Sequence, residues 1–236
     1  MPSSEPGPLY WSFLGSLPYG EADELQRRLR ERVRQTPGGG YLLLLEHPHV
    51  FTLGRNANPG DILVDEEWLS SKETAVFASD RGGRVTYHGP GQLVGYPILD
   101  LSPDRRDLRR YVRDLQEVLV RALSELGIEA EPRHQTEEIG VWVEGQKIAS
   151  IGVHVSRWIT THGFALNLTT DLSYFAGIIP CGLEGVEMTS VEALTGRRPE
   201  LEEASQRVAE HFCQVFERQP LRLETSRILE PWPITL

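Results

Sequence analysis

A glycine-rich run over residues 81–92 constrains the fold more than any other part of the chain. It reads Arg-Gly-Gly-Arg-Val-Thr-Tyr-His-Gly-Pro-Gly-Gln and contains four glycines and one proline. Such a run cannot lie inside a regular helix or a long strand, because glycine and proline interrupt both. Its glycines permit positive φ and let backbone N–H groups approach a ligand, while the polar side chains add hydrogen-bond donors. The run therefore predicts two tight turns around a short strand or a substrate-binding loop.

The rest of the chain alternates between strand and helix patterns. Apolar runs and period-two alternation predict strands over residues 9–14, 41–46, 50–53, 74–78, 92–99, 139–143, 147–155 and 158–168. Apolar residues at spacings of three and four predict helices over residues 21–34, 65–70, 103–126, 189–195 and 199–217, the third of them capped by Ser102 and stopped by Gly127. Hairpins mixed with separated helices favour an α+β fold, in which helices flank a mixed, largely antiparallel sheet.

Length and composition favour one domain. The 236 residues, 39% of them hydrophobic, are enough to bury a substantial core. We expect a flexible segment over residues 1–8 and a single domain over residues 9–236. No apolar stretch approaches the roughly 20 residues of a membrane span. The N-terminus lacks the basic and apolar regions of a secretory signal. We therefore expect a cytoplasmic protein with no membrane partner.

The charge distribution bears on possible partners. A net charge of −10 argues against nucleic acid as a partner, because phosphate contacts need a basic face. The arginines are nevertheless concentrated in one predicted helix, at Arg105, Arg106, Arg109, Arg110 and Arg113. This stretch is either a solvated helix face or a docking surface for an acidic partner protein.

The two cysteines occupy contrasting settings. Cys213 falls within a predicted amphipathic helix, where a thiol packs in the core. Cys181 lies between Pro180 and Gly182 in an irregular segment that can present a thiol to a substrate. Two cysteines are too few for a disulfide scaffold, so we expect both to be reduced. Cys181 is therefore the candidate nucleophile.

The seven histidines do not follow the spacing of a known metal site, and we expect no metal. They do leave a second catalytic interpretation open. A cysteine can be activated by a nearby histidine, and His88 or His154 could be the base for Cys181.

Several sequence blocks, in their order along the chain, resemble the lipoyl(octanoyl) transferase family. The fixed positions of the family signature are all occupied in the glycine-rich run, by Arg81, Gly82, Gly83, Thr86, Tyr87, His88, Gly91 and Gln92. Further matching blocks lie at residues 46–48, 52–55, 147–152, 162–167 and 180–182. The resemblance extends from about Leu9 to Gly196.

The resemblance implies the fold of biotin and lipoate protein ligases and a single catalytic acyltransferase domain. Members of the family transfer an octanoyl group from octanoyl-acyl carrier protein to a lysine of lipoyl domains. This reaction is the first committed step of lipoate cofactor biosynthesis. The implied acceptors are the lipoyl domains of 2-oxoacid dehydrogenase E2 subunits and the glycine cleavage H protein. We expect a monomer that needs no cofactor.

The resemblance also assigns roles to individual residues. Cys181 is expected to carry the acyl group as a thioester, and Lys147 to stabilise the thiolate and exchange protons. Local sequence alone would place Lys147 in a solvated hairpin turn. The expected substrate-binding residues are Arg81, Gly82, Gly83, Arg84, Val85, Thr86, Tyr87, His88, Ser150, Ile151, Gly152, Gly163, Phe164 and Ala165.

Three alternative functions differ in their chemistry. An ATP-dependent lipoate or biotin ligase of the same fold would activate a free acid as an acyl-adenylate and need no acyl-cysteine. A non-catalytic module would bind the carrier protein and leave Cys181 unreactive. A cysteine hydrolase would release the free acid without an amine acceptor.

Overall fold

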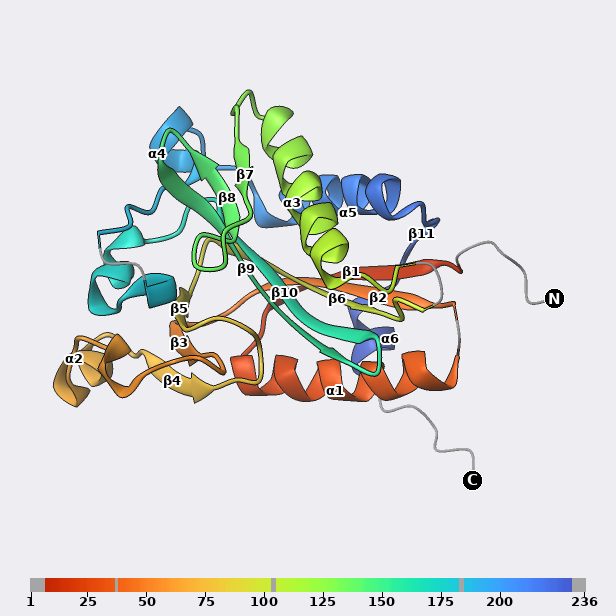
Figure 1. Ribbon diagram of the computed structural model, residues 1–236, viewed down its shortest axis with the longest axis horizontal. Coiled ribbons are helices and arrows are strands. Elements are labelled where there is room, and N and C mark those ends of the chain that lie inside the picture. The colour runs from red at the N-terminus through yellow and green to blue at the C-terminus, as the bar shows by residue number, and fades with distance from the viewer. Residues whose placement is uncertain (1–6, 37, 103–104, 183–184, 231–236) are drawn as a thin grey trace.

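The computed structural model describes residues 7–230, apart from 37, 103–104 and 183–184. Over these residues the chain forms an eight-stranded mixed sheet and a separate three-stranded sheet (Figure 1). The large sheet has the strand order β11-β1-β2-β6-β10-β9-β8-β7. Only the β11–β1 and β1–β2 pairs of this sheet are parallel, so the sheet is largely antiparallel, as predicted.

Most of the strands follow apolar runs of the sequence, whereas the short strands at residues 131–133 and 220–222 were not predicted. The large sheet contains β1 (Leu9–Ser16), β2 (Gly40–Glu46), β6 (Gln92–Leu99), β7 (Glu131–Arg133), β8 (Gly140–Val143), β9 (Gln146–Ser156), β10 (Ile159–Asn167) and β11 (Pro220–Arg222). The small sheet contains β3 (Val50–Leu53), β4 (Ala75–Ala78) and β5 (Val85–His88). Strand β5 lies inside the glycine-rich run, which therefore forms a short strand with turns on both sides.

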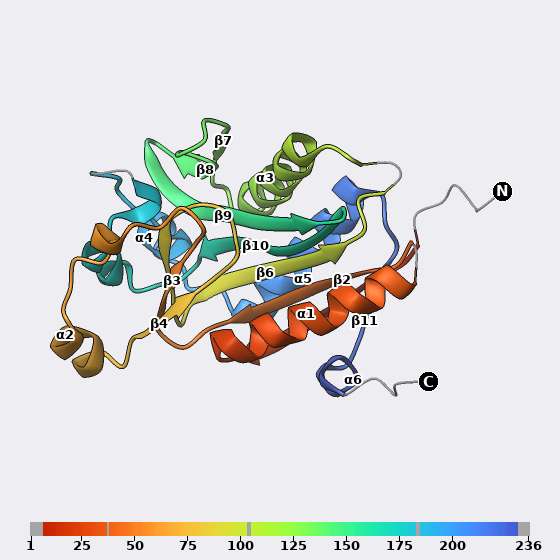
Figure 2. The same cartoon turned by 60° about the horizontal axis from the view of Figure 1, so that its bottom comes forward.

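Helices cover both faces of the large sheet (Figure 2). Helix α1 (Tyr19–Gln35) packs on one face, and α3 (Leu108–Ser124) and α5 (Leu201–Phe216) pack on the other. The fully buried strand β2 serves both cores: Leu42 and Leu44 face α3 and α5, whereas Leu43 and Leu45 face α1. The shorter helices are α2 (Glu66–Ser71), α4 (Val191–Thr195) and α6 (Thr225–Leu229), with 3₁₀ turns η1 (Pro59–Asp61), η2 (Leu172–Gly177) and η3 (Pro180–Gly182).

The start of α3 differs from the sequence prediction, and the N-terminal segment remains a prediction. Ser102 does not cap the third predicted helix: α3 begins at Leu108, and the side chain of Asp107 caps it by accepting from the N–H groups of Arg109 and Arg110. Pro103 lies outside the described residues. The expected flexible segment over residues 1–8 also stays a prediction, because residues 1–6 lie outside the described part of the chain.

Strands β6 and β10 approach each other at two glycines. Gly95 pairs with Phe164, and the ring of Phe164 lies over Gly95. A Cβ added at Gly163 would come within 2.2 Å of the carbonyl oxygen of Gly95. Because this neighbour is backbone in the centre of the sheet, it cannot move aside as a side-chain tip would.

We predict that Gly163→Ala lowers the free energy of unfolding by about 1–3 kcal/mol, the usual cost of overpacking a buried site. Urea denaturation monitored by circular dichroism would measure it. Gly60→Ala is the matched control, because a Cβ at Gly60 meets no atom within 4 Å. Equal stability of the two variants would contradict the close approach of the strands.

Candidate active site

A pocket lies where the glycine-rich run meets strands β9 and β10. Its lining includes all of the predicted substrate-binding residues except Val85 and Tyr87, namely Arg81, Gly82, Gly83, Arg84, Thr86, His88, Ser150, Ile151, Gly152, Gly163, Phe164 and Ala165. The backbone of Gly82 donates a hydrogen bond of 3.0 Å to the carbonyl of Val153, which ties the run to β9. Sequence blocks separated by about 70 residues are thus brought to one site.

Val85 and Tyr87 point away from this pocket. Successive side chains of a strand face opposite sides, so β5 directs Thr86 and His88 to the pocket and the other two into a separate core. In that core they pack with Phe51 and with aromatic residues of η2. Because side chains alternate along a strand, the sequence of β5 could have distinguished the two residues that face the pocket from the two that face the core.

Three residues of the pocket were not predicted as substrate-binding. Tyr19 comes from α1, Tyr96 from β6 and His162 from β10. The hydroxyl of Tyr19 is 2.9 Å from the hydroxyl of Ser79. The hydroxyl of Tyr96 donates to Nε2 of His47 over 2.7 Å. The local sequence does not indicate that Tyr19 or Tyr96 lines a pocket. Tyr19 reaches the pocket only because α1 packs on the sheet.

Arg81 joins the glycine-rich run to the small sheet. Its Nε donates to Oγ1 of Thr52 over 3.1 Å, and its Nη2 donates to the carbonyl of the same residue over 2.5 Å. The side chain is buried, and it forms one wall of the pocket. Arg81 therefore shapes the site through its hydrogen bonds as well as lining it.

Arg84 connects three segments at the edge of the pocket. Its guanidinium forms an ion pair with the buried carboxylate of Asp61, which belongs to η1. The hydrogen bonds from Arg84 lower the pKa of Asp61, so that this carboxylate stays ionised. A Cβ at Gly182 would overlap Arg84, which places the backbone of η3 directly against this side chain.

A series of buried hydrogen bonds leads from His88 to Lys147. Nδ1 of His88 donates to Oε1 of Gln92 over 2.7 Å, and the amide of Gln92 donates to Asn167 over 2.9 Å. The amide of Asn167 donates to the carbonyl of Thr189, whose own N–H donates to the carbonyl of Lys147, both over 3.0 Å. Burial lowers the pKa of His88 well below its ordinary value, so the ring is neutral.

Lys147 is buried on β9, the strand that also supplies Ser150, Ile151 and Gly152 to the pocket. Its side chain is 1% exposed, although it is close to the turn between β8 and β9. Residues 187–189 run alongside it: the N–H of Lys147 donates to Glu187, and its carbonyl accepts from Thr189. Nζ of Lys147 lies 5.5 Å from the centroid of the Trp142 ring. The lysine is thus held by contacts that the local sequence could not reveal.

Cys181 lies in η3, which packs against β5. The chain continues from η3 to residues 187–189, the segment that runs beside Lys147. The backbone of Cys181 is therefore close in sequence and in space to elements of the pocket. Its side chain lies outside the part of the chain that the structure describes.

The comparisons with known proteins agree with this geometry. The sequence profile of the lipoyl protein ligase A/B catalytic domain matches residues 18–213. The chain belongs to this family. Octanoyltransferases from Solibacter usitatus and Rubrobacter xylanophilus are each 49% identical to it, over 88% and 86% of this chain and 93% and 90% of theirs. The resemblance seen in the sequence is confirmed, and the relatives' names support a transferase.

Solved structures with the same fold are much more distant in sequence. Lipoate-protein ligase A bound with ATP is similar with a TM-score of 0.73 and 16% identity, over 94% of this chain and 92% of that one. Apo biotin protein ligase from Aquifex aeolicus is similar with a TM-score of 0.50 and 12% identity, over 89% and 70%. The predicted fold class is confirmed. Across the described residues of this family member, no helix has the length and apolar character needed to cross a membrane.

Cys213 has the setting expected of a core cysteine. It lies on α5 and is 5% exposed, and burial raises the pKa of its thiol to about 11. A thiol in this environment stays protonated at neutral pH and is a poor nucleophile. In this lipoyl protein ligase A/B family member, Cys213 therefore belongs to the core.

Asp80 contacts two further histidines near the pocket, His154 and His162. Its carboxylate lies 2.6 Å from Nε2 of His162 and 2.7 Å from Nδ1 of His154, and the hydrogen bond from His162 is the main cause that lowers the pKa of Asp80. Asp23 comes within ligand distance of Asp80 and His162, but it pairs with Arg27 at 2.6 Å.

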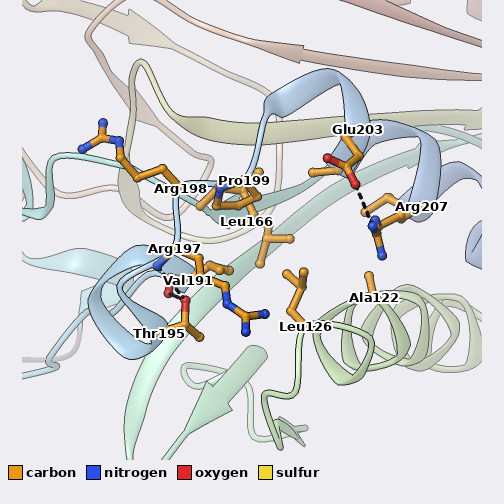
Figure 3. A pocket seen from close by; sticks show the side chains of 13 residues that line it. Ala122, Leu126, Leu166, Val191, Thr195, Arg197, Arg198, Pro199, Glu203 and Arg207 are labelled. Carbon is orange, nitrogen blue, oxygen red and sulfur yellow. Dashed lines mark hydrogen bonds and ion pairs between the residues drawn. The ribbon is translucent and has the colours of Figure 1, made fainter.

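A second pocket lies on the other side of the sheet, between α3, α5 and residues 195–199 (Figure 3). Leu126, Leu166 and Val191 contribute to its apolar floor. Of the arginines at its rim, Arg198 pairs with Glu192 and Arg207 with Glu203. Within the described part of the chain, its lining contains none of the predicted site residues.

The arginine-rich stretch begins far from Lys147, but its helix α3 runs back toward that residue. The N–H of Leu101 donates to the carbonyl of Trp158, so the segment before α3 is at the β9–β10 turn. Lys147 is at the opposite end of β9, yet Gln116, one helical turn after Arg113, donates to the carbonyl of Gly140, which lies beside the Lys147 side chain. Arg105 is engaged by Asp114, and Arg106 donates to Ser102. These contacts favour the interpretation as a structural and solvated face.

The burial of His47, whose ring accepts a hydrogen bond from Tyr96 of the pocket, makes the stability of the fold depend on pH. Its Nδ1 donates to the carbonyl of Leu17 over 2.6 Å, and burial lowers the pKa of His47 to about 4. In the unfolded chain the pKa is about 6.5, so protonation between these values favours unfolding. The stability that neutral His47 provides is complete above about pH 6.5 and is lost as the pH falls toward 4.

We predict that between pH 7 and pH 5 the parent loses about 2 kcal/mol more free energy of unfolding than His47→Gln, because glutamine does not titrate. Urea denaturation at the two pH values would measure the difference. An identical loss in parent and variant would show that His47 is not the group that titrates.

Proposed function

We propose that the chain transfers an octanoyl group from octanoyl-acyl carrier protein to a lysine of lipoyl domains through a thioester on Cys181. The acceptors would be the lipoyl domains of 2-oxoacid dehydrogenase E2 subunits and the glycine cleavage H protein, in the first committed step of lipoate cofactor biosynthesis. The observation that carries the proposal is the burial of Lys147 on β9, a strand that lines the pocket, and its backbone hydrogen bonds to residues 187–189, which follow the segment of Cys181. The protein would act as a monomer in the cytoplasm and need no cofactor.

The pocket suits an acyl chain. Ile151, Phe164 and Ala165 offer apolar surface, while the glycines leave room beside the backbone. Burial of an octanoyl tail in such a site would contribute on the order of 0.8 kcal/mol per methylene. The hydroxyl groups of Tyr19 and Tyr96, which line the pocket, have hydrogen-bond partners of their own. The pocket can therefore accept an apolar tail without leaving these groups unsatisfied.

The reaction divides into two acyl transfers. The Cys181 thiolate attacks the carbonyl carbon of the donor thioester, and the bond to the carrier's phosphopantetheine sulfur breaks as that sulfur takes up a proton. The neutral amine of the acceptor lysine then attacks the acyl-cysteine, which forms the amide and releases the Cys181 sulfur. Lys147 would favour the thiolate by its charge and carry protons between the thiol, the departing sulfur and the amine.

The donor thioester explains why ATP is unnecessary. The acyl group is already activated, and its transfer to cysteine keeps it as a thioester. An ATP-dependent ligase is the main alternative, because lipoate-protein ligase A bound with ATP has the same fold. That likeness concerns the fold alone. Activity with free octanoate and ATP would favour the ligase, and release of free acid without an acceptor would favour a hydrolase.

We predict that incubation with octanoyl-acyl carrier protein adds one octanoyl group to Cys181, and that hydroxylamine removes it. Intact-mass and peptide mass spectrometry would locate the adduct. Cys213→Ser is the matched control and should acylate as the parent does, because the buried thiol of Cys213 is protonated. An unmodified Cys181 during turnover, or normal transfer by Cys181→Ala, would exclude the covalent route. Binding without modification would favour the non-catalytic module.

We predict that Lys147→Met slows transfer to the lipoyl domain by about 10²-fold or more, the range of a lost acid–base group. Alkylation of Cys181 by iodoacetamide should also be slower at neutral pH and recover as the pH rises. Lys147→Arg should retain alkylation better than transfer, because arginine keeps the charge but does not release a proton. A parental alkylation profile in Lys147→Met, with a shifted profile in His88→Ala or His154→Ala, would identify a Cys/His pair instead.

A further inference from the structure

Trp142 lies directly opposite Lys147 in the sheet. The register of β8 and β9 pairs these two residues, so their side chains emerge on the same face. Both are buried, with exposed fractions of 2% for Trp142 and 1% for Lys147. The 5.5 Å between Nζ and the ring centroid is within the range of a cation–π interaction, which is strongest for tryptophan and for desolvated pairs.

The indole is itself fixed by contacts on its other side. Its Nε1–H donates to the carbonyl of Glu138 over 2.8 Å. The guanidinium carbon of Arg133, from β7, lies 4.2 Å from the centroid of the same ring. Because β8 lies between β7 and β9, Trp142 is held from one neighbouring strand and contacts Lys147 on the other.

Gly140 provides the space for the lysine side chain. A Cβ at this position would lie 2.6 Å from Cε of Lys147 and 2.4 Å from the carbonyl oxygen of Ala149. The methylene chain of Lys147 thus passes over a glycine before its ammonium reaches the indole. A lysine side chain has four rotatable bonds, and both contacts restrict it to one path.

We propose that Trp142 is a positioning residue, whose indole face holds the Lys147 ammonium at the wall of the acyl-transfer site. This inference rests on the proposed function of Lys147. Trp142 does not line the substrate pocket as far as the structure describes it, so its effect should fall on kcat rather than on the KM for the carrier substrate.

The decisive experiment replaces Trp142 site-specifically with tryptophans that carry one, two and four fluorine atoms on the benzo ring. Fluorine withdraws electron density from the π face while the shape and the N–H donor to Glu138 stay nearly unchanged. We expect kcat for transfer from octanoyl-acyl carrier protein to fall stepwise, by about tenfold across the series. The KM for octanoyl-acyl carrier protein and the melting temperature should change little.

The same series at Trp158 is the matched control, because that ring also faces a cation, Arg106 at 6.0 Å, but lies at the far end of β9. It should leave kcat unchanged. A flat series at Trp142, with Lys147→Met inactive, would overturn the positioning role and leave the proposed function standing. Full activity in Lys147→Met would overturn the role of Lys147, and the positioning role with it, whereas a parent that transfers no octanoyl group would overturn the proposed function.

Discussion

The site depends on the buried hydrogen bonds that run from His88 through Gln92 and Asn167 to the backbone beside Lys147. These groups come from the glycine-rich run, β10 and residues 187–189, which are distant from one another in the sequence. In a buried environment each bond also orients the next, and removal of one partner leaves another polar group unsatisfied at a cost of about 1–3 kcal/mol. The pocket and the lysine are therefore parts of one rigid unit.

Much of this arrangement could be predicted from the sequence. The run at 81–92, the β9–β10 hairpin and most helices follow from local patterns, and their motif blocks do meet at one pocket. The burial of Lys147 could not be predicted locally, because residues 187–189 and Trp142 produce it. Strand β11 was missed for a similar reason: its pairing with β1 joins the two ends of the described chain. Tyr19 and Tyr96 became visible only after α1 was packed on the sheet.

The fold alone does not determine the chemistry of this family. A structure of lipoate-protein ligase A with ATP bound has the same architecture as this chain. Under the proposed function, a few side chains would separate a thioester relay from adenylation, Cys181 and Lys147 among them. In this protein the relevant cations are either engaged by the protein, as Arg84 is by Asp61, or buried against an aromatic ring, as Lys147 is.

The close approach of Gly163 to the backbone of Gly95 has a consequence for protein engineering. The width of the pocket at this point is set by two main chains, so it is fixed to within the small tolerance of a sheet. Substitutions there could only obstruct the site. Tyr19 and Tyr96, in contrast, line the pocket with side chains that come from other elements. Redesign toward longer or shorter acyl donors should therefore start at these tyrosines, where shape depends on side chains.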